Sequence, residues 1–307
     1  MVVLENSTNV RTSGWGMPAD PSGNKGEGTA GRGFHLATLL EGLRPRTVVE
    51  RAALAFLTPE RHVAPPMLPE PAGGAVLAVP GRSPHLAARI WGGDTSRPAI
   101  LLLHGWEGQT YDMVPLVQPL LDWGFRVVAV DAPAHGRSAG HVATLPDFAR
   151  AALDVAALVG PLAGAVGHSL GGTALVLAAE MGLSLPRLAL IGSPAKPLRF
   201  ASKVARAYGL DADQTTAMLR IVEDVAGIPV SAIDLPAMVA RMAAVGTAPA
   251  GMVIHSSDDR IVRVADALEI AGRWPGSRLR LRDGLGHRRI LSDPAVGAEI
   301  AGWFAEA

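Results

Sequence analysis

Residues 162–172 read LAGAVGHSLGG, and this stretch decides the fold. Its first half is an apolar run that predicts a β-strand, and residues 173–180 continue its second half as an Ala- and Leu-rich helix. Gly167, Ser169 and Gly171 form a G-x-S-x-G pattern between them, in which the glycines let strand and helix approach closely and let the backbone take strained angles. The pattern predicts a tight turn that exposes the serine hydroxyl at the positive end of a helix, where a negatively charged oxygen is stabilised.

The composition describes a globular chain with a large core. Of 307 residues, 49% are hydrophobic and 18% are charged, and equal totals of 28 for Lys+Arg and Asp+Glu leave no net charge. This balance argues against nucleic acid or an anionic membrane as the main partner. The chain has no cysteine, which excludes disulfides, thiolate catalysis and thiolate metal sites. Its longest uncharged apolar run, residues 155–167, is too short to span a bilayer, so we expect a cytoplasmic protein. The sequence does not determine an oligomeric state.

The chain alternates between strand-like and helix-like runs from Ala75 to Phe304, after a polar, glycine-rich stretch (residues 1–36) that we expect to be a disordered leader. Such alternation predicts a mostly parallel sheet with helices on both faces. The first two strand-like runs, 75–79 and 85–91, are close enough in sequence to pair antiparallel. The other strand-like runs are 99–103, 126–130, 162–167, 187–191, 251–255 and 277–281. Helix-like runs are 45–57, 113–123, 147–159, 170–181, 263–273 and 294–304.

One interval lacks strands. Residues 192–250 offer only helical patterns, at 200–208, 214–225 and 235–245, which predict a small helical lid inserted after the sixth strand. We therefore expect a core of residues 37–197 and 248–307 and a lid of residues 198–247. Most apolar side chains of the lid would hold it on the core. A minority, among them Met218, Met238 and Met242, are expected to face a substrate pocket, where soft Met side chains are adaptable.

Four motifs follow strand ends in a fixed order. They are H-G-W at 104–106, D-A-P-A-H-G-R-S at 131–138, the turn at 167–171, and G-L-G-H at 284–287. Their order resembles the serine-nucleophile, esterase- and lipase-like branch of the α/β-hydrolase superfamily. The resemblance covers about residues 75–304 and implies an eight-stranded α/β-hydrolase fold, with the turn at 167–171 as its nucleophile elbow.

The resemblance implies that Ser169 is the nucleophile and His287 its base. A serine hydroxyl is a poor nucleophile until a base removes its proton. His287 lies between the last strand and the final helix, where the superfamily places its catalytic histidine, and the chain order of Ser, acid and His is kept. His168 adjoins the serine, but neighbours in such a turn usually point apart, so we expect it to line the pocket or to be structural.

The acid of the triad is expected after the seventh strand. The sequence there resembles the family pattern G-x-x-D-x-x-V, and alignment on Val262 selects Asp259. Its role would be to hold the imidazole in the useful tautomer. Ser256 and Arg263 depart from the usual form of this pattern, so Asp258 stays open as the acid.

The resemblance also places the oxyanion hole at the backbone N–H groups of Trp106 and Leu170. The indole ring of Trp106 is expected to line the pocket. No clustered His and carboxylate spacing indicates a metal site, and the implied chemistry needs no cofactor.

The sequence thus predicts a cofactor-independent serine hydrolase that cleaves a carboxylic ester of a small molecule through an acyl-enzyme on Ser169. A serine at the elbow argues against dehalogenases and epoxide hydrolases, which need a carboxylate there. The same triad also serves thioesterases, lactonases, carbon–carbon hydrolases and perhydrolases, so these stay open. A non-catalytic small-ligand receptor on the same fold is the alternative from another class. The identity of the substrate and its chain length do not follow from the sequence.

Overall fold

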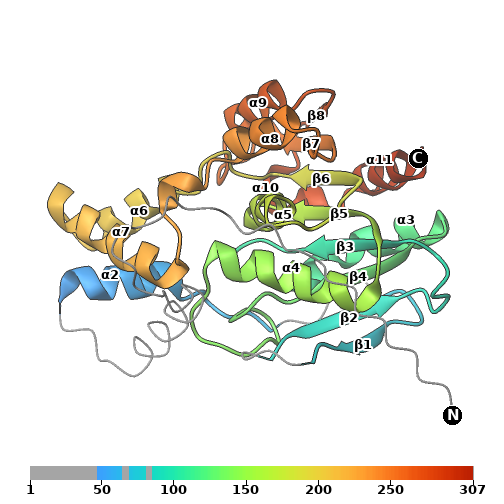
Figure 1. Ribbon diagram of the computed structural model, residues 1–307, viewed down its shortest axis with the longest axis horizontal. Coiled ribbons are helices and arrows are strands. Elements are labelled where there is room, and N and C mark those ends of the chain that lie inside the picture. The colour runs from blue at the N-terminus through green and yellow to red at the C-terminus, as the bar shows by residue number, and fades with distance from the viewer. Residues whose placement is uncertain (1–46, 64–68, 81–84, 307) are drawn as a thin grey trace, which may run out of the picture.

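The computed structural model describes residues 47–63, 69–80 and 85–306, and its centre is an eight-stranded sheet in the order β1-β2-β4-β3-β5-β6-β7-β8 (Figure 1). β2 pairs antiparallel with both β1 and β4, and the other neighbours pair parallel. The expectation of an eight-stranded, mostly parallel sheet is confirmed. The predicted leader, residues 1–36, lies outside the described residues. The strands are β1 (Ala75–Ala78), β2 (Ala87–Trp91), β3 (Ala99–Leu103), β4 (Arg126–Val130), β5 (Leu162–His168), β6 (Arg187–Ile191), β7 (Ala250–Ser256) and β8 (Arg278–Arg282).

Helices cover both faces of the sheet. Every residue of β3 is buried, because successive side chains point to opposite faces and both faces are covered. Leu101 and Leu103 pack in the cluster beneath α4, α5, α8 and α9, whereas Ile100 and Leu102 pack in the cluster beneath α3 and α11. These helices are α3 (Val117–Asp122), α4 (Leu145–Val159), α5 (Leu170–Glu180), α8 (Leu235–Ala244), α9 (Val264–Arg273) and α11 (Pro294–Ala305).

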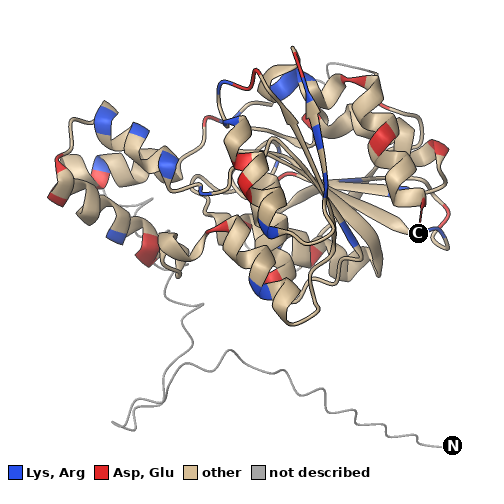
Figure 2. Ribbon diagram, turned by 90° about the horizontal axis from the view of Figure 1, so that it is seen from above, with Lys and Arg blue, Asp and Glu red and all other residues tan. Residues whose placement is uncertain are grey.

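Three further helices form a separate layer, called the cap here: α2 (Val48–Leu57), α6 (Arg199–Ala207) and α7 (Ala212–Ala226). The cap projects from one side of the core in Figures 1 and 2. Its apolar centre joins Ala53 and Leu57 of α2 to Ala201 of α6 and to Met218 and Val222 of α7. α2 therefore packs on α6 and α7 although it lies outside the 198–247 segment. α8 lies within that segment but packs on α5 and α9.

The cap helices have strong local end signals. Thr47 and Glu50 form a capping box that satisfies backbone N–H groups at the start of α2, and Asp211 and Gln214 do the same for α7. α7 ends at Gly227, which adopts a left-handed conformation (φ 72°). These local signals set the ends of the cap helices independently of how the helices pack.

The expected helix at 113–123 differs from the structure. The chain there forms a 3-10 helix, η1 (Thr110–Leu116), followed by the short α3. Pro115 lies inside η1, and a proline lacks the N–H that would continue a regular α-helix. The other predicted helices and strands agree with the structure to within a few residues at each end. Short elements not expected from the sequence are η2 (Val230–Ala232), α10 (Gly286–Arg289) and η3 (Ile290–Ser292).

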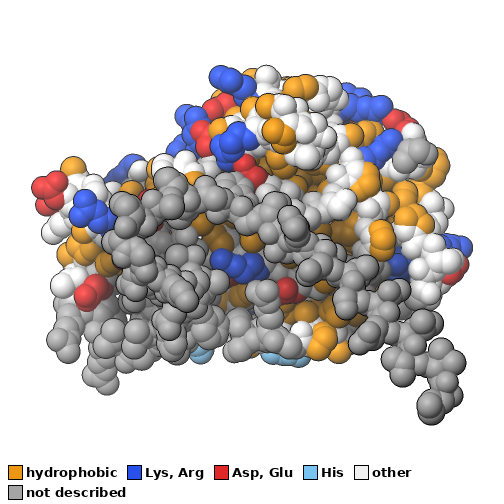
Figure 3. Space-filling model, in the orientation of Figure 1, with side chains coloured by type: hydrophobic (Ala, Val, Ile, Leu, Met, Phe, Trp, Pro, Cys, Tyr) orange, Lys and Arg blue, Asp and Glu red, His pale blue; other side chains and the backbone are white. Residues whose placement is uncertain are grey.

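Charged side chains of both signs are mixed over the outer helices. Basic and acidic groups lie together over α8 and α9 in the upper part of Figure 3. Arg241 pairs with Glu180 at 2.8 Å, and Lys196 pairs with Glu269 at 2.9 Å. Among the described helices, none combines the length and apolar character needed to cross a membrane.

Candidate active site

The serine of the G-x-S-x-G motif lies on a strained turn between β5 and α5. Ser169 has φ 51° and ψ −124°, a conformation that costs energy for a residue with a side chain. A Cβ at Gly171 would overlap the carbonyl oxygen of His104, and one at Gly167 would overlap the backbone of Gly172. The two glycines are therefore needed for the close approach of α5 to the strands, which in turn holds Ser169 in its strained geometry.

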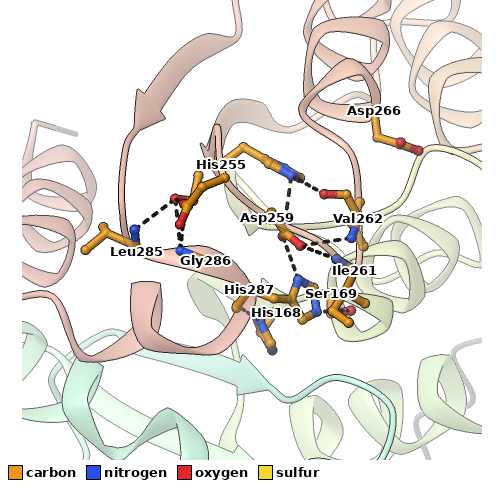
Figure 4. Close-up of polar contacts among 12 residues, drawn as sticks. His168, Ser169, His255, Asp259, Ile261, Val262, Asp266, Leu285, Gly286 and His287 are labelled. Atoms are coloured by element: carbon orange, nitrogen blue, oxygen red, sulfur yellow. Dashed lines mark hydrogen bonds and ion pairs between the residues drawn. The ribbon is translucent and has the colours of Figure 1, made fainter.

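Ser169, His287 and Asp259 form one hydrogen-bonded line (Figure 4). The Ser169 Oγ lies 3.0 Å from His287 Nε2, and His287 Nδ1 lies 2.7 Å from Asp259 Oδ2. An ionised carboxylate can only accept, so Nδ1 carries the proton and Nε2 is left to accept from the serine hydroxyl. The structure thus brings together three residues that are far apart in the sequence.

The carboxylate of Asp259 is held by several donors. The backbone N–H groups of Ile261 and Val262 donate to its Oδ1 at 2.8 and 2.9 Å. Burial alone raises the pKa of this carboxyl, but the hydrogen bonds from His287, Val262 and Ile261, together with the electrostatic attraction of His287, outweigh burial and bring the pKa below its ordinary value. Asp259 is therefore ionised at neutral pH.

Asp258, the other carboxylate considered, has a different contact. Its Oδ1 accepts a hydrogen bond at 2.9 Å from the backbone N–H of Gly286, immediately before His287. Ser256 Oγ hydrogen-bonds to the same carboxylate and lies 3.2 and 3.1 Å from the N–H groups of Leu285 and Gly286. Asp258 and Ser256 thus hold the start of α10, the short helix that carries His287, while Asp259 contacts the imidazole itself.

His255 is a neighbour of Asp259 to which the sequence alone assigned no catalytic role. It is fully buried, its Nε2 lies 2.9 Å from the carbonyl oxygen of Val262, and the same nitrogen lies 3.5 Å from Asp259 Oδ2. The Nε2–H therefore donates to Val262, and the His255 ring lies on the side of Asp259 opposite His287 (Figure 4). The signal available in the sequence was the four-residue spacing between His255 and Asp259.

His168 lies against His287, with ring centroids 4.8 Å apart. Its Nε2–H donates to the backbone carbonyl of His287 at 2.9 Å. Burial, reinforced by the nearby His287, lowers the pKa of His168 to about 3, so its ring is neutral at physiological pH. His168 both lines the cavity described below and supports the backbone of His287.

The H-G-W loop runs directly beside the serine. A Cβ at Gly105 would lie only 2.8 Å from Ser169 Cβ. Among the described residues, the backbone N–H of Trp106 has no hydrogen-bond acceptor. Leu170 is the first residue of α5, so its N–H has no acceptor within the helix. These two backbone N–H groups belong to the segments that flank Ser169.

The H-G-W loop is tied to the motif at 131–138. His104 Nδ1–H donates to the carbonyl of Gly105 at 2.7 Å, and His104 Nε2 accepts from the N–H of Ala132 at 3.0 Å. The ring of His135 lies between those of His104 and Trp106, at centroid distances of 5.3 and 5.0 Å. Burial lowers the pKa of both histidines, that of His135 to about 3, so they are neutral packing groups.

A cavity of about 560 Å³ opens at the serine and extends beneath the cap. Trp106, His168, Ser169, Leu170 and His287 all line it.

The three methionines expected in the pocket lie elsewhere, which corrects that expectation. Met218 packs in the centre of the cap, and Met238 and Met242 pack between α8 and the helices of the core. Helical spacing identified a buried face but not what covers it. Within the described part of the chain, no three His, Asp or Glu side chains are grouped so as to hold a metal ion.

Comparison with known proteins defines the class. A family model described as the alpha/beta hydrolase family matches residues 100–300, more than half of the chain. The chain therefore belongs to the alpha/beta hydrolase family.

Individual relatives are more distant. A serine hydrolase-like protein of Dictyostelium discoideum is 35% identical over 104 residues, which are 31% of this chain and 28% of that protein. An esterase of Pyrococcus furiosus has a similar structure, with a TM-score of 0.59 and 18% identity over 81% of this chain and 97% of its own. The thioesterase domain from the curacin biosynthetic pathway gives a TM-score of 0.55 and 16% identity over 76% of this chain and 99% of its own. At these sequence identities, the structural similarity shows a common fold and nothing further.

Proposed function

We propose that this protein is a serine hydrolase that cleaves a carboxylic ester through an acyl-enzyme on Ser169. The observation that carries the proposal is the hydrogen-bonded line from Ser169 through His287 to Asp259, at the mouth of a cavity large enough for a small molecule. Membership of the alpha/beta hydrolase family agrees with it.

Each residue of the line has a distinct part in the proposed reaction. Ser169 Oγ attacks the ester carbonyl carbon while His287 Nε2 takes the hydroxyl proton. The bond to the alcohol oxygen then breaks, and His287 returns the proton to the leaving alkoxide. A water molecule, deprotonated by the same nitrogen, attacks the acyl carbon. The bond to Ser169 Oγ then breaks, His287 returns the proton to that oxygen, and the carboxylic acid is released. Asp259 keeps the proton on Nδ1 and stabilises the imidazolium that forms transiently.

The negative charge that develops on the carbonyl oxygen also needs a partner. The N–H groups of Trp106 and Leu170 are proposed as the oxyanion hole, since both belong to segments beside Ser169. Among the described residues the N–H of Trp106 has no acceptor, and that of Leu170 has none within α5. Removal of a single such donor costs other serine hydrolases about a hundred- to a thousandfold in kcat.

Substitution of Ser169 by alanine tests the proposal directly. We expect p-nitrophenyl acetate and butyrate to be hydrolysed by the wild-type protein and kcat to fall by more than about a thousandfold in Ser169→Ala, because the nucleophile is absent. A fluorophosphonate probe should label the wild type at Ser169 and leave the variant unlabelled.

Ser202→Ala serves as the matched control, because Ser202 is an exposed serine of α6 that does not line the cavity. It should retain full turnover and labelling. Ester turnover that survives in Ser169→Ala would reject the assignment of the nucleophile. A wild-type protein that is inert towards esters and thioesters, and is not labelled by the probe, would favour a receptor instead.

A further inference from the structure

The cavity at Ser169 has a wall supplied by the cap. This wall is apolar and combines residues from helices that are distant in sequence. It includes Phe56 and Leu57 of α2, Val204 of α6, and Val222 and Ala226 of α7. Leu145, at the start of α4 in the core, also lines the cavity. Apolar walls favour an apolar part of a ligand, because its contact with water is lost on binding.

The α2 part of this wall is fixed in place by the core of the cap. Ala53 and Leu57 of α2 are 0% and 2% exposed, and they pack in one cluster with Met218 and Val222 of α7. Val222 belongs both to this cluster and to the lining of the cavity. α2 therefore cannot move away from the cavity without breaking the centre of the cap.

Each charged side chain that lines the cavity is either hydrogen-bonded within the protein or exposed to solvent. The carboxylate of Glu107 accepts from the N–H of Glu60 at 3.2 Å, and that of Asp112 accepts from the N–H of Gln109 at 2.9 Å. Lys203 and Arg288 are exposed to solvent. The wall formed by α2 and α7 therefore presents hydrocarbon, and the polar lining lies nearer the catalytic loops and the solvent.

We propose that α2 determines the chain-length specificity of this protein, and that the substrate carries an aliphatic chain longer than acetyl that lies against Ala55 and Phe56 of α2. The inference rests on the proposed function of Ser169. It goes beyond the family relationship, because α2 (residues 48–57) lies before the matched residues 100–300. The aliphatic chain could belong to the acyl part or to the alcohol part of the ester, so the test varies the length of both parts.

Burial of each additional methylene against this wall should increase kcat/KM about fourfold until the cavity is filled. The measurement uses two substrate series with wild-type protein: p-nitrophenyl esters from acetyl to dodecanoyl, and acetate esters of linear alcohols from ethanol to dodecanol. A rise in kcat/KM with length is expected in one of them.

The decisive variant is Ala55→Trp, because Ala55 lines the cavity but is exposed, so an indole there narrows the cavity without overfilling a core. We expect kcat/KM for octanoyl or octyl esters to fall at least tenfold, with acetyl or ethyl esters changed less than twofold. Arg51→Trp is the matched control, since it adds the same ring to an exposed position of α2 outside the cavity lining, and it should leave both values unchanged. Val222→Ala, which enlarges the cavity, should move the preferred length upwards.

The outcomes separate this inference from the proposed function. A wild-type protein that is not labelled at Ser169 and cleaves no ester removes the basis for both. Labelling and turnover with equal kcat/KM for short and long chains in both series overturn the inference alone. The inference is also overturned if Ala55→Trp changes the chain-length preference no more than Arg51→Trp does, because the aliphatic chain would then lie against another wall.

Discussion

Asp258 and Asp259 are adjacent carboxylates that contact different groups: Asp258 accepts from the N–H of Gly286, and Asp259 contacts the imidazole of His287. Substitution of each should therefore change kcat by a different amount. Asp259→Asn should lower kcat by about four orders of magnitude, because the amide would stabilise the wrong tautomer of His287. Asp258→Asn keeps an oxygen that can accept from Gly286, and it should lower kcat by less than about tenfold. Steady-state ester hydrolysis at pH 7.5 compares the two.

Double substitution provides the control for this comparison. If Asp258 acts only through the loop before His287, adding Asp258→Asn to Asp259→Asn should leave the residual rate nearly unchanged. A larger loss in Asp258→Asn than in Asp259→Asn would exchange the two assignments.

The sequence predicted the three residues of the hydrogen-bonded line because each lies in a motif that follows a strand end. Their catalytic roles remain a proposal. The sequence favoured Asp259 but left Asp258 open, since the choice depends on which carboxylate is turned towards His287. Nor could it show that Ser256, first noted as a departure from a glycine, fastens the loop before His287. These contacts join residues about thirty positions apart and leave no local pattern.

The close packing at the junction of β5 and α5 requires residues without side chains at Gly167 and Gly171. Gly171→Ala should place a methyl group on the carbonyl oxygen of His104, which is backbone and cannot give way cheaply. We expect the free energy of unfolding to fall by about 1–3 kcal/mol, and Ser169 to lose its position relative to His287. Urea unfolding and fluorophosphonate labelling report these two effects separately.

Gly182→Ala tests whether any glycine replacement near α5 is as costly. Gly182 follows α5, and a Cβ there would meet no atom within 4 Å, although its φ of 105° carries a conformational cost. It should destabilise the protein without reducing labelling per folded molecule. Equal labelling in Gly171→Ala and the wild type would contradict the steric account of the elbow.

Sheet and helices were predictable because their signals are local, namely apolar runs, helical periodicity and caps. The break at Pro115 and the association of α2 with α6 and α7 were not. Periodicity shows that α2 has an apolar face but not that its partner lies far along the chain. The positions of Met218, Met238 and Met242 were missed for the same reason.

The whole molecule should lose stability in mild acid. His135 and His168 have pKa values lowered to about 3, chiefly by burial, and burial also lowers the pKa of His104. In the unfolded chain His135 and His168 would titrate near 6.5, so between pH 6.5 and 3 the unfolded state binds more protons there and acid favours it, and His104 acts in the same direction. The free energy of unfolding should be nearly constant above pH 7 and then fall, by up to about 1.4 kcal/mol per pH unit for each histidine.

Urea unfolding at pH 7.5, 6.0 and 5.0 measures this slope. His135→Phe should reduce it, because His135 already packs edge-on against Phe148 and a phenyl ring has no proton to bind. The lowered pKa of Asp259 adds to acid destabilisation only at lower pH, below the ordinary carboxyl range near 3.8. A slope identical in His135→Phe and the wild type would show that this histidine is not buried in its neutral form.

The shared packing of α2 and α7 also has a consequence for synthesis on the ribosome. α2 has 10 residues, too few for a stable helix in water, and α7 leaves the ribosome roughly 150 residues later. At about 5–20 residues per second, the apolar face of α2 waits on the order of ten seconds for its partner. During that time a chaperone could bind it, so the yield of folded protein should depend on translation speed between these two helices.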